Sequence, residues 1–168
     1  IIQNYGTLNM MGEGKMTRNY ENTNEYGCVM NAPGVSGTVL NLYGGTYDNV
    51  KSNKGVAIGS NAGTINIFPG VTVNDQMHLQ NTAVVNIYGG TFNNIWTRGS
   101  GTSRATVNVY GGNFNPYSGR FPTYGTATCP DFNICGGKYY TTRGGAAVIA
   151  FRIPEAAPTG FMMTASHS

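Results

Sequence analysis

Charged residues are scarce in this chain and account for only 10% of it. The 10 Lys and Arg and 7 Asp and Glu give a formal net charge of +3, and the basic residues are scattered along the sequence. Without a dense basic cluster, nucleic-acid binding has little electrostatic support. No apolar run approaches the roughly 18 residues that a membrane-spanning helix needs. We therefore expect neither nucleic-acid binding nor membrane insertion.

Cysteine and histidine are also rare, with 3 Cys and 2 His. There is no C-x-x-C motif, and His78 and His167 lack the spacing of metal ligands, so we predict no metal site and no cofactor. The odd number of cysteines leaves their pairing open. Cys129 and Cys135 could close a short loop, Cys28 could bond Cys135 of a molecule stacked end to end, or all three could be idle thiols.

The polar character comes instead from uncharged residues, with 20 Asn and 19 Thr beside 25 Gly and 11 Tyr. Asn, Gly and Thr are poor helix formers, whereas Thr and Tyr favour strands, so the composition predicts an all-β protein. The sequence starts Ile1-Ile2 without an initiator Met or a signal peptide. We interpret it as a mature or trimmed product and expect an extracellular or cell-surface location.

One short motif recurs along the chain, centred on an asparagine. Its copies span residues 7–12, 39–47, 64–70, 84–92, 106–114 and 131–139, and the first is the weakest. The central residues are Asn9, Asn41, Asn66, Asn86, Asn108 and Asn133, separated by steps of 32, 25, 20, 22 and 25. A period of this length with one strong strand per copy is typical of a solenoid. Leucine-rich repeats would need recurring Leu, and propeller blades would be nearly twice as long.

Alternation within each copy predicts which side chains face inward. In the copy around Asn86, Val85 and Ile87 should point to the interior, and Asn86 and Tyr88 should point outward. The Gly-Gly pair should form a corner, since glycine tolerates positive φ, and Phe92 should turn back inside. We expect a single domain over 1–168, with an irregular N-terminal segment (1–37), regular coils (38–145) and a terminal strand and tail (146–168).

The N-I-Y-G-G-T-F unit of residues 86–92 resembles right-handed parallel β-helix proteins of the pectate-lyase-like superfamily. It is most similar to bacterial surface and adhesin-like solenoids rich in GGTF repeats. The resemblance implies an all-β, right-handed parallel β-helix (a β-solenoid) of about six coils. It indicates architecture and leaves the chemistry open, because enzymes, fibres, adhesins and stalks share the fold.

A row of outward-facing amides and aromatic rings is the main candidate binding surface. It consists of Asn41, Tyr43, Asn66, Phe68, Asn86, Tyr88, Asn108 and Tyr110. Stacked amides can bond along the axis and stabilise the solenoid itself. The aromatic stripe could instead bind sugar rings or contact another protein.

Catalytic residues are not evident in the sequence. Polysaccharide hydrolases need two carboxylates about 5–9.5 Å apart. Asp48 and Asp75 follow the corners of consecutive copies and could face each other, but their distances from the motif asparagine differ. We interpret them as turn-forming residues and predict no catalytic site. The segment Trp96–Arg104 is expected to be a surface loop.

We therefore expect a secreted or cell-surface structural β-solenoid that self-assembles into a fibre or serves as an adhesive module. Three features motivate this: no clear charged cap, an apolar segment over 146–153, and an odd cysteine. Edge pairing through the solenoid ends would supply the contact, with a second copy as the partner. The alternative is a polysaccharide-binding or polysaccharide-degrading module, with a glycan as the partner.

Overall fold

A computed structural model of the chain describes residues 2–19, 27–49, 56–98, 103–115, 123–124 and 130–140. These residues form 16 β-strands, and all regular structure among them is β. The described residues include no helix long and apolar enough to cross a membrane. The strands are arranged in two parallel sheets, so the all-β prediction is confirmed.

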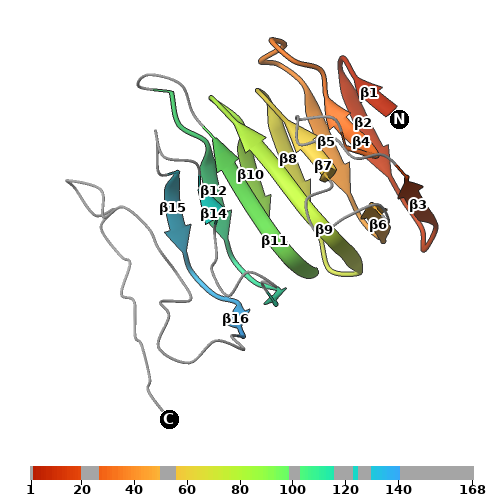
Figure 1. The fold of residues 1–168 in the computed structure, drawn as a ribbon, viewed down its shortest axis with the longest axis vertical. Coiled ribbons are helices and arrows are strands. Elements are labelled where there is room, and N and C mark those ends of the chain that lie inside the picture. The colour runs from red at the N-terminus through yellow and green to blue at the C-terminus, as the bar shows by residue number, and fades with distance from the viewer. Residues whose placement is uncertain are drawn as a thin grey trace.

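The recurring motif forms one sheet of six strands (Figure 1). Its strands are β2 (Thr7–Met10), β5 (Val39–Leu42), β8 (Thr64–Ile67), β10 (Val84–Ile87), β12 (Thr106–Val109) and β15 (Asp131–Ile134). They lie in the order β15-β12-β10-β8-β5-β2, and every neighbouring pair is parallel. The pairing aligns each motif asparagine with the next, for example Asn86 with Asn66 and Asn108.

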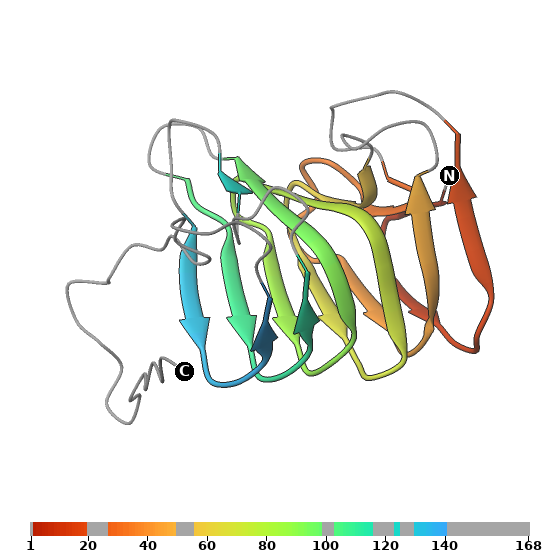
Figure 2. The same cartoon turned by 60° about the horizontal axis from the view of Figure 1, so that its bottom comes forward.

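The linking segments form a second, ten-stranded sheet. Its strands are β1 (Ile2–Asn4), β3 (Lys15–Arg18), β4 (Val29–Asn31), β6 (Gly45–Asn49), β7 (Val56–Ser60), β9 (Val71–Gln80), β11 (Thr91–Arg98), β13 (Asn113–Phe114), β14 (Thr123–Tyr124) and β16 (Lys138–Tyr139). Figure 2 shows the two sheets facing each other, with strands stacked from the N-terminal end (red) to the C-terminal end (blue). This arrangement is compatible with the predicted β-solenoid.

Glycine pairs turn the chain from the first sheet into the second. Gly90 has a φ of 106°, and Gly112 has a φ of 113°. A Cβ on Gly90 would lie 2.8 Å from the carbonyl oxygen of Val71 in the preceding turn. Only glycine fits such a corner, since it accepts positive φ and lets neighbouring backbones approach.

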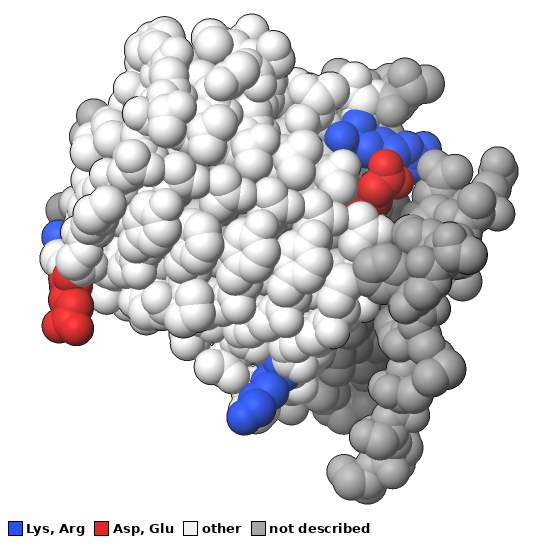
Figure 3. All heavy atoms as spheres, turned by 180° about the vertical axis from the view of Figure 1, so that it is seen from behind, with Lys and Arg blue, Asp and Glu red and all other residues white. Residues whose placement is uncertain are grey.

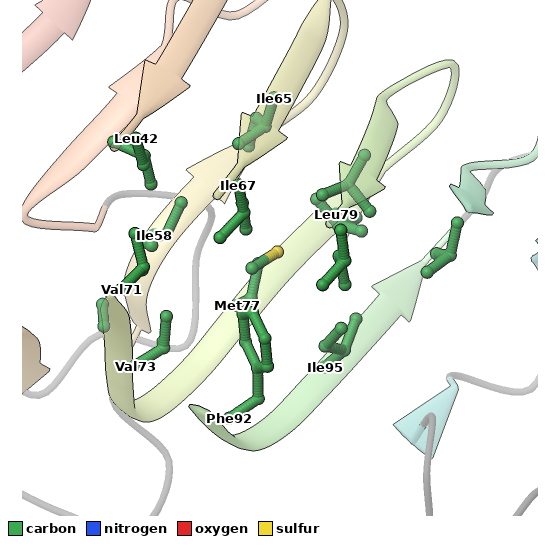
Figure 4. Close-up of a cluster of buried hydrophobic side chains, with 14 of the residues drawn as sticks. Leu42, Ile58, Ile65, Ile67, Val71, Val73, Met77, Leu79, Phe92 and Ile95 are labelled. Atoms are coloured by element: carbon green, nitrogen blue, oxygen red, sulfur yellow. The ribbon is translucent and has the colours of Figure 1, made fainter. Parts of the chain in front are cut away.

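The core lies between the sheets and is built from aliphatic side chains (Figure 4). Ile65, Ile67, Val85 and Ile87 have no exposed surface, as the alternation predicted. Below the glycine corner, Phe92 stacks on Phe114 with ring centroids 5.1 Å apart, and Phe114 stacks on Tyr139 at 4.9 Å. The apolar side chains of each turn are therefore buried only because they pack against the turns on either side along the axis.

The N-terminal segment is more regular than predicted. Residues 1–37 were expected to be irregular, but β3 and β4 lie there and pair in parallel with β6 and β7. Met16 and Val29 contribute to the core there without the asparagine motif that marks the strands of the six-stranded sheet. The predicted terminal strand over 146–153 lies outside the described residues.

The segment Trp96–Arg104, which was expected to be a surface loop, begins as part of a strand. Trp96 and Thr97 belong to β11 and pair with His78 and Leu79 of β9. Aromatic and β-branched residues favour strands, and the neighbouring strand supplies their hydrogen-bond partners. The predicted loop is therefore wrong for Trp96–Arg98, and residues 99–102 lie outside the described residues.

Candidate functional site

The motif asparagines form one continuous hydrogen-bonded ladder along the outer face of the six-stranded sheet. Each side-chain Nδ2 donates to the Oδ1 of the asparagine one strand closer to the N-terminus. The five bonds are Asn41 to Asn9, Asn66 to Asn41, Asn86 to Asn66 and Asn108 to Asn86, each 2.8 Å, and Asn133 to Asn108 at 2.7 Å. Every amide in the row therefore has the same orientation.

This uniform orientation makes the two ends of the ladder chemically different. Asn9 uses its Oδ1 within the ladder, so its Nδ2 donor faces away from the stack. Asn133 uses its Nδ2, so its Oδ1 acceptor faces away at the opposite end. Among the described residues, neither outward group has a ladder partner. The ladder therefore presents a donor at the β2 edge and an acceptor at the β15 edge.

Beside the ladder, four aromatic rings form a stack. The ring centroids are 4.6 Å apart between Tyr43 and Phe68, 5.2 Å between Phe68 and Tyr88, and 5.1 Å between Tyr88 and Tyr110. The three tyrosines are between 43% and 48% exposed. Because each ring covers the face of the next, the inner members offer solvent their edges. A sugar ring could stack face to face only at the ends of this row.

The outer face of the six-stranded sheet carries very little charge. Outward residues of its four inner strands are Val39, Asn41, Thr64, Asn66, Val84, Asn86, Thr106 and Asn108. In Figure 3 the middle of this side of the molecule is white, and the charged residues lie at its margins. The surface is therefore flat, regular and uncharged, with Asp131 on the edge strand β15.

Core side chains at both ends of the stack are less covered than those in the middle. Leu8, Met10 and Met16 near the N-terminal end, and Ile134 and Tyr139 near the C-terminal end, are only partly buried. Their counterparts Leu40 and Leu42, one strand further in, are fully buried. Both ends of the described stack thus present apolar surface beside the edge of a sheet.

Met11 and Cys135 occupy the ends of the aromatic row. The Tyr43 amide donates to the carbonyl of Met10, which sets Tyr43 level with Met11, and the Cys135 amide donates to Val109, which sets Cys135 level with Tyr110. Met11 is 77% exposed, and Cys135 is exposed. Desolvation raises the pKa of the Cys135 thiol.

The cysteines that the structure describes are free thiols. Cys28 is buried, and its Sγ donates to the carbonyl oxygen of Asp48 at 3.1 Å. Burial raises the pKa of this thiol, so it stays protonated at neutral pH. Cys129, the third candidate for a disulfide, lies outside the described residues.

The two carboxylates singled out in the sequence occupy different environments. Asp48 forms an ion pair with Lys15, with an Oδ2 to Nζ distance of 3.0 Å. Asp75 is 4% exposed, and its Oδ1 accepts a hydrogen bond from the Gln76 amide at 2.8 Å. The pairing of β6 with β9 ends at Tyr47 and Val73, before Asp48 and Asp75 are reached, so no strand register aligns the two carboxylates. The described residues contain no cluster of three or more His, Cys, Asp or Glu suited to a metal ion.

A polar cluster on the ten-stranded sheet was not predicted from the amino-acid sequence. His78 is fully buried, and its ring lies 4.0 Å from that of Trp96. Gln80 Nε2 lies 3.3 Å from His78 Nε2, and Asn61 donates to Gln80 and accepts from Asn81. The register of β9 and β11 brings His78 and Trp96 together although they are 18 positions apart in the sequence (96 minus 78), and the pairing of β7 with β9 brings Asn61 beside Gln80.

Comparisons with known proteins add no family to this description. No protein-family model, no curated protein and no solved structure matches the chain.

Proposed function

We propose that the chain is a right-handed parallel β-helix of about six coils, similar to the pectate-lyase-like superfamily. The six aligned copies of the asparagine motif and the two parallel sheets support this proposal. Right-handed crossovers are the general rule for parallel strands.

We further propose that this solenoid is an extracellular or cell-surface structural protein that self-associates through its ends into a fibre or adhesive assembly. The observation that carries the proposal is the pair of open ends. At each end, partly exposed core side chains lie beside a motif strand that has a sheet neighbour on one side only among the described residues. Exposed parallel edges of this kind are templates for pairing with another chain.

Free backbone groups at these edges are suited to strand addition. The amides of Asp131 and Cys135 donate back to Ala105 and Val109. Because alternate residues of a parallel strand bond to opposite sides, the amide of Ile134 points away from the stack. A second copy could accept a hydrogen bond from it, with backbone hydrogen bonds supplying affinity.

A structural role is also consistent with the environments of the candidate acid–base residues. Asp48 is engaged by Lys15, and Asp75 is buried against its own backbone. Among the described residues, no strand register aligns these two carboxylates as the facing pair that glycoside hydrolysis needs. We therefore propose that the chain is not an enzyme.

Sedimentation velocity across a concentration series tests the proposal. We expect the average mass to rise from that of the 17.9 kDa chain toward dimers and longer species as concentration increases, with rods in negative-stain images. A wild-type protein that stays monomeric at high concentration would mean that the edges are covered within the chain, for example by residues 146–153. That result would contradict self-association.

Binding of a neutral polysaccharide is a second candidate, favoured by the half-exposed tyrosine edges on an uncharged face. Tyrosine hydroxyls there could hydrogen-bond to sugars laid across the row. Pull-down with insoluble polysaccharides would test it, comparing wild type with Tyr88→Phe, which removes one hydroxyl and keeps the stack. Equal retention of both proteins would count against this binding mode.

A further inference from the structure

We infer that the self-association is head-to-tail: the β15 edge of one molecule pairs with the β2 edge of the next, so that copies of the chain form an open, polar fibre. This inference rests on the proposed function and specifies the partner of each end.

The direction of the amide ladder is the first argument. Asn9 presents an outward Nδ2 donor, and Asn133 presents an outward Oδ1 acceptor. Joining unlike ends continues the ladder with the bond that it already makes five times. Joining two like ends would set donor against donor or acceptor against acceptor, which leaves these polar groups unsatisfied at the contact.

The backbone gives the same direction. The amides of Val39 and Tyr43 donate to the carbonyls of Gly6 and Met10. The backbone groups of Gly6 and Met10 therefore face β5. By alternation, those of Thr7 and Asn9 face outward. In the parallel register of the molecule, the outward carbonyl of Asn9 meets the outward amide of Ile134. A two-fold contact between like ends would instead require antiparallel pairing, which the described sheets do not use.

The apolar side chains fit this register too. Continuing the pairing by one more strand places Met10 over Ile134, and both of these side chains are only partly buried in the single chain. Throughout the sheet, the equivalent positions pair apolar residues, such as Leu8 with Leu40 and Phe132 with Val107. A head-to-tail contact that repeats the step between strands does not close on itself, so it produces an open fibre.

One substitution should weaken the contact between copies without disturbing the fold of each molecule. Asn9→Asp removes the outward donor but keeps an oxygen that can accept from Asn41, so the ladder within the molecule persists. The new carboxylate would face the Asn133 acceptor of the next copy. We expect association to weaken about tenfold or more, the effect of an unsatisfied polar group at a contact. The matched control is Asn86→Asp, which breaks an interior bond and should lower folding stability while leaving the association of the folded protein unchanged.

A mixing experiment tests the polarity directly. Thr7→Pro and Ile134→Pro each remove an outward amide at one edge and keep the hydrogen bonds to the inner strand, the position where edge strands tolerate proline. Thr7→Ala and Ile134→Val keep the amide and serve as controls. We expect each proline variant to be monomeric alone and a 1:1 mixture to form dimers of twice the mass, because one unblocked end of each kind remains.

Dimers formed by either proline variant alone would overturn the polarity while leaving self-association intact. Absence of association in the wild type would instead contradict the proposed function. If a proline variant fails to fold, as judged by fluorescence of Trp96, Asn9→Asp decides the matter. Equal association of Asn9→Asp and wild type would overturn the inference.

Discussion

Individual residues in this fold are constrained mainly by the chain directly above or below them. Gly90 illustrates this, because its φ of 106° and the 2.8 Å between a hypothetical Cβ and the Val71 oxygen both exclude a side chain. Gly6, by contrast, has open space around a hypothetical Cβ. Gly90 is therefore required by the packing of the corner, whereas Gly6 is not.

Gly90→Ala should destabilise the protein by more than about 1 kcal/mol, because alanine disfavours positive φ and the backbone of the preceding turn must shift. Gly6→Ala should change the free energy of unfolding by less than about 0.5 kcal/mol. Urea denaturation of both variants measures the difference. Equal costs would show that the corner is less tightly packed than the structure indicates.

Tyrosine ionisation makes the fold sensitive to alkali. Burial raises the pKa of Tyr47 and of Tyr139, whose hydroxyls donate to the carbonyls of Gly44 and Gly136. The folded state therefore holds these protons more tightly than the unfolded chain, whose tyrosines ionise near pH 10. Stability is complete below about pH 10 and falls as the pH rises above it.

The pH dependence of unfolding measures this effect. We expect the double variant Tyr47→Phe with Tyr139→Phe to lose less stability between about pH 9 and 11 than the wild type does. An identical loss in both proteins would assign the alkaline sensitivity to other groups.

At the scale of elements, aromatic residues differ in how much they stabilise the fold, depending on whether they lie in the core or on the outer face. The inner stack of Phe92, Phe114 and Tyr139 and the outer stack of Tyr43, Phe68, Tyr88 and Tyr110 have similar ring spacings. Phe114 is fully buried, whereas Tyr110 is 48% exposed. Burial, rather than stacking, should therefore decide how much each ring stabilises the fold.

Phe114→Ala should cost about 3–5 kcal/mol, the range for removing a buried aromatic ring from a core. Tyr110→Ala should cost less than about 1.5 kcal/mol, close to the value of one exposed stacking pair. Chemical denaturation followed through Trp96, the only tryptophan, compares them. A larger cost for Tyr110→Ala would indicate that the outer stack stabilises the molecule more than its exposure implies.

Elements that carry the motif could be predicted from the sequence. The alternation around Asn41, Asn66, Asn86 and Asn108 correctly assigned inward and outward residues, and the glycine pairs marked the corners. Strands β3, β4 and the end of β11 could not be predicted, because they lack the asparagine motif and only their pairing with other turns of the chain reveals them. The His78–Trp96 cluster was missed for the same reason.

For the whole molecule, charge at the ends should regulate association. Successive pairings place Lys15, Thr46, Thr72, Thr91, Asn113 and Lys138 in one row along the axis. A head-to-tail contact would bring Lys138 beside Lys15 of the next copy. Since each chain also carries a net charge of +3, repulsion should weaken association at low ionic strength.

We expect association to strengthen several-fold between about 20 and 200 mM salt, because the Debye length shortens over this range. Lys138→Glu should associate better at low salt and lose this dependence, while Lys138→Arg should behave like the wild type. Sedimentation velocity at both salt concentrations provides the measurement. Unchanged salt dependence in Lys138→Glu would place Lys138 outside the contact.

The amino-acid sequence determined the strand content, the motif period and the inward or outward orientation of residues within each copy, since these follow from local alternation and the conformational range of glycine. Only the tertiary structure decided that the asparagine amides all point the same way, that the aromatic rings cover one another's faces, and that the two ends differ in hydrogen-bonding character. These properties depend on the parallel register between turns that are 20 or more residues apart, and no local pattern specifies them.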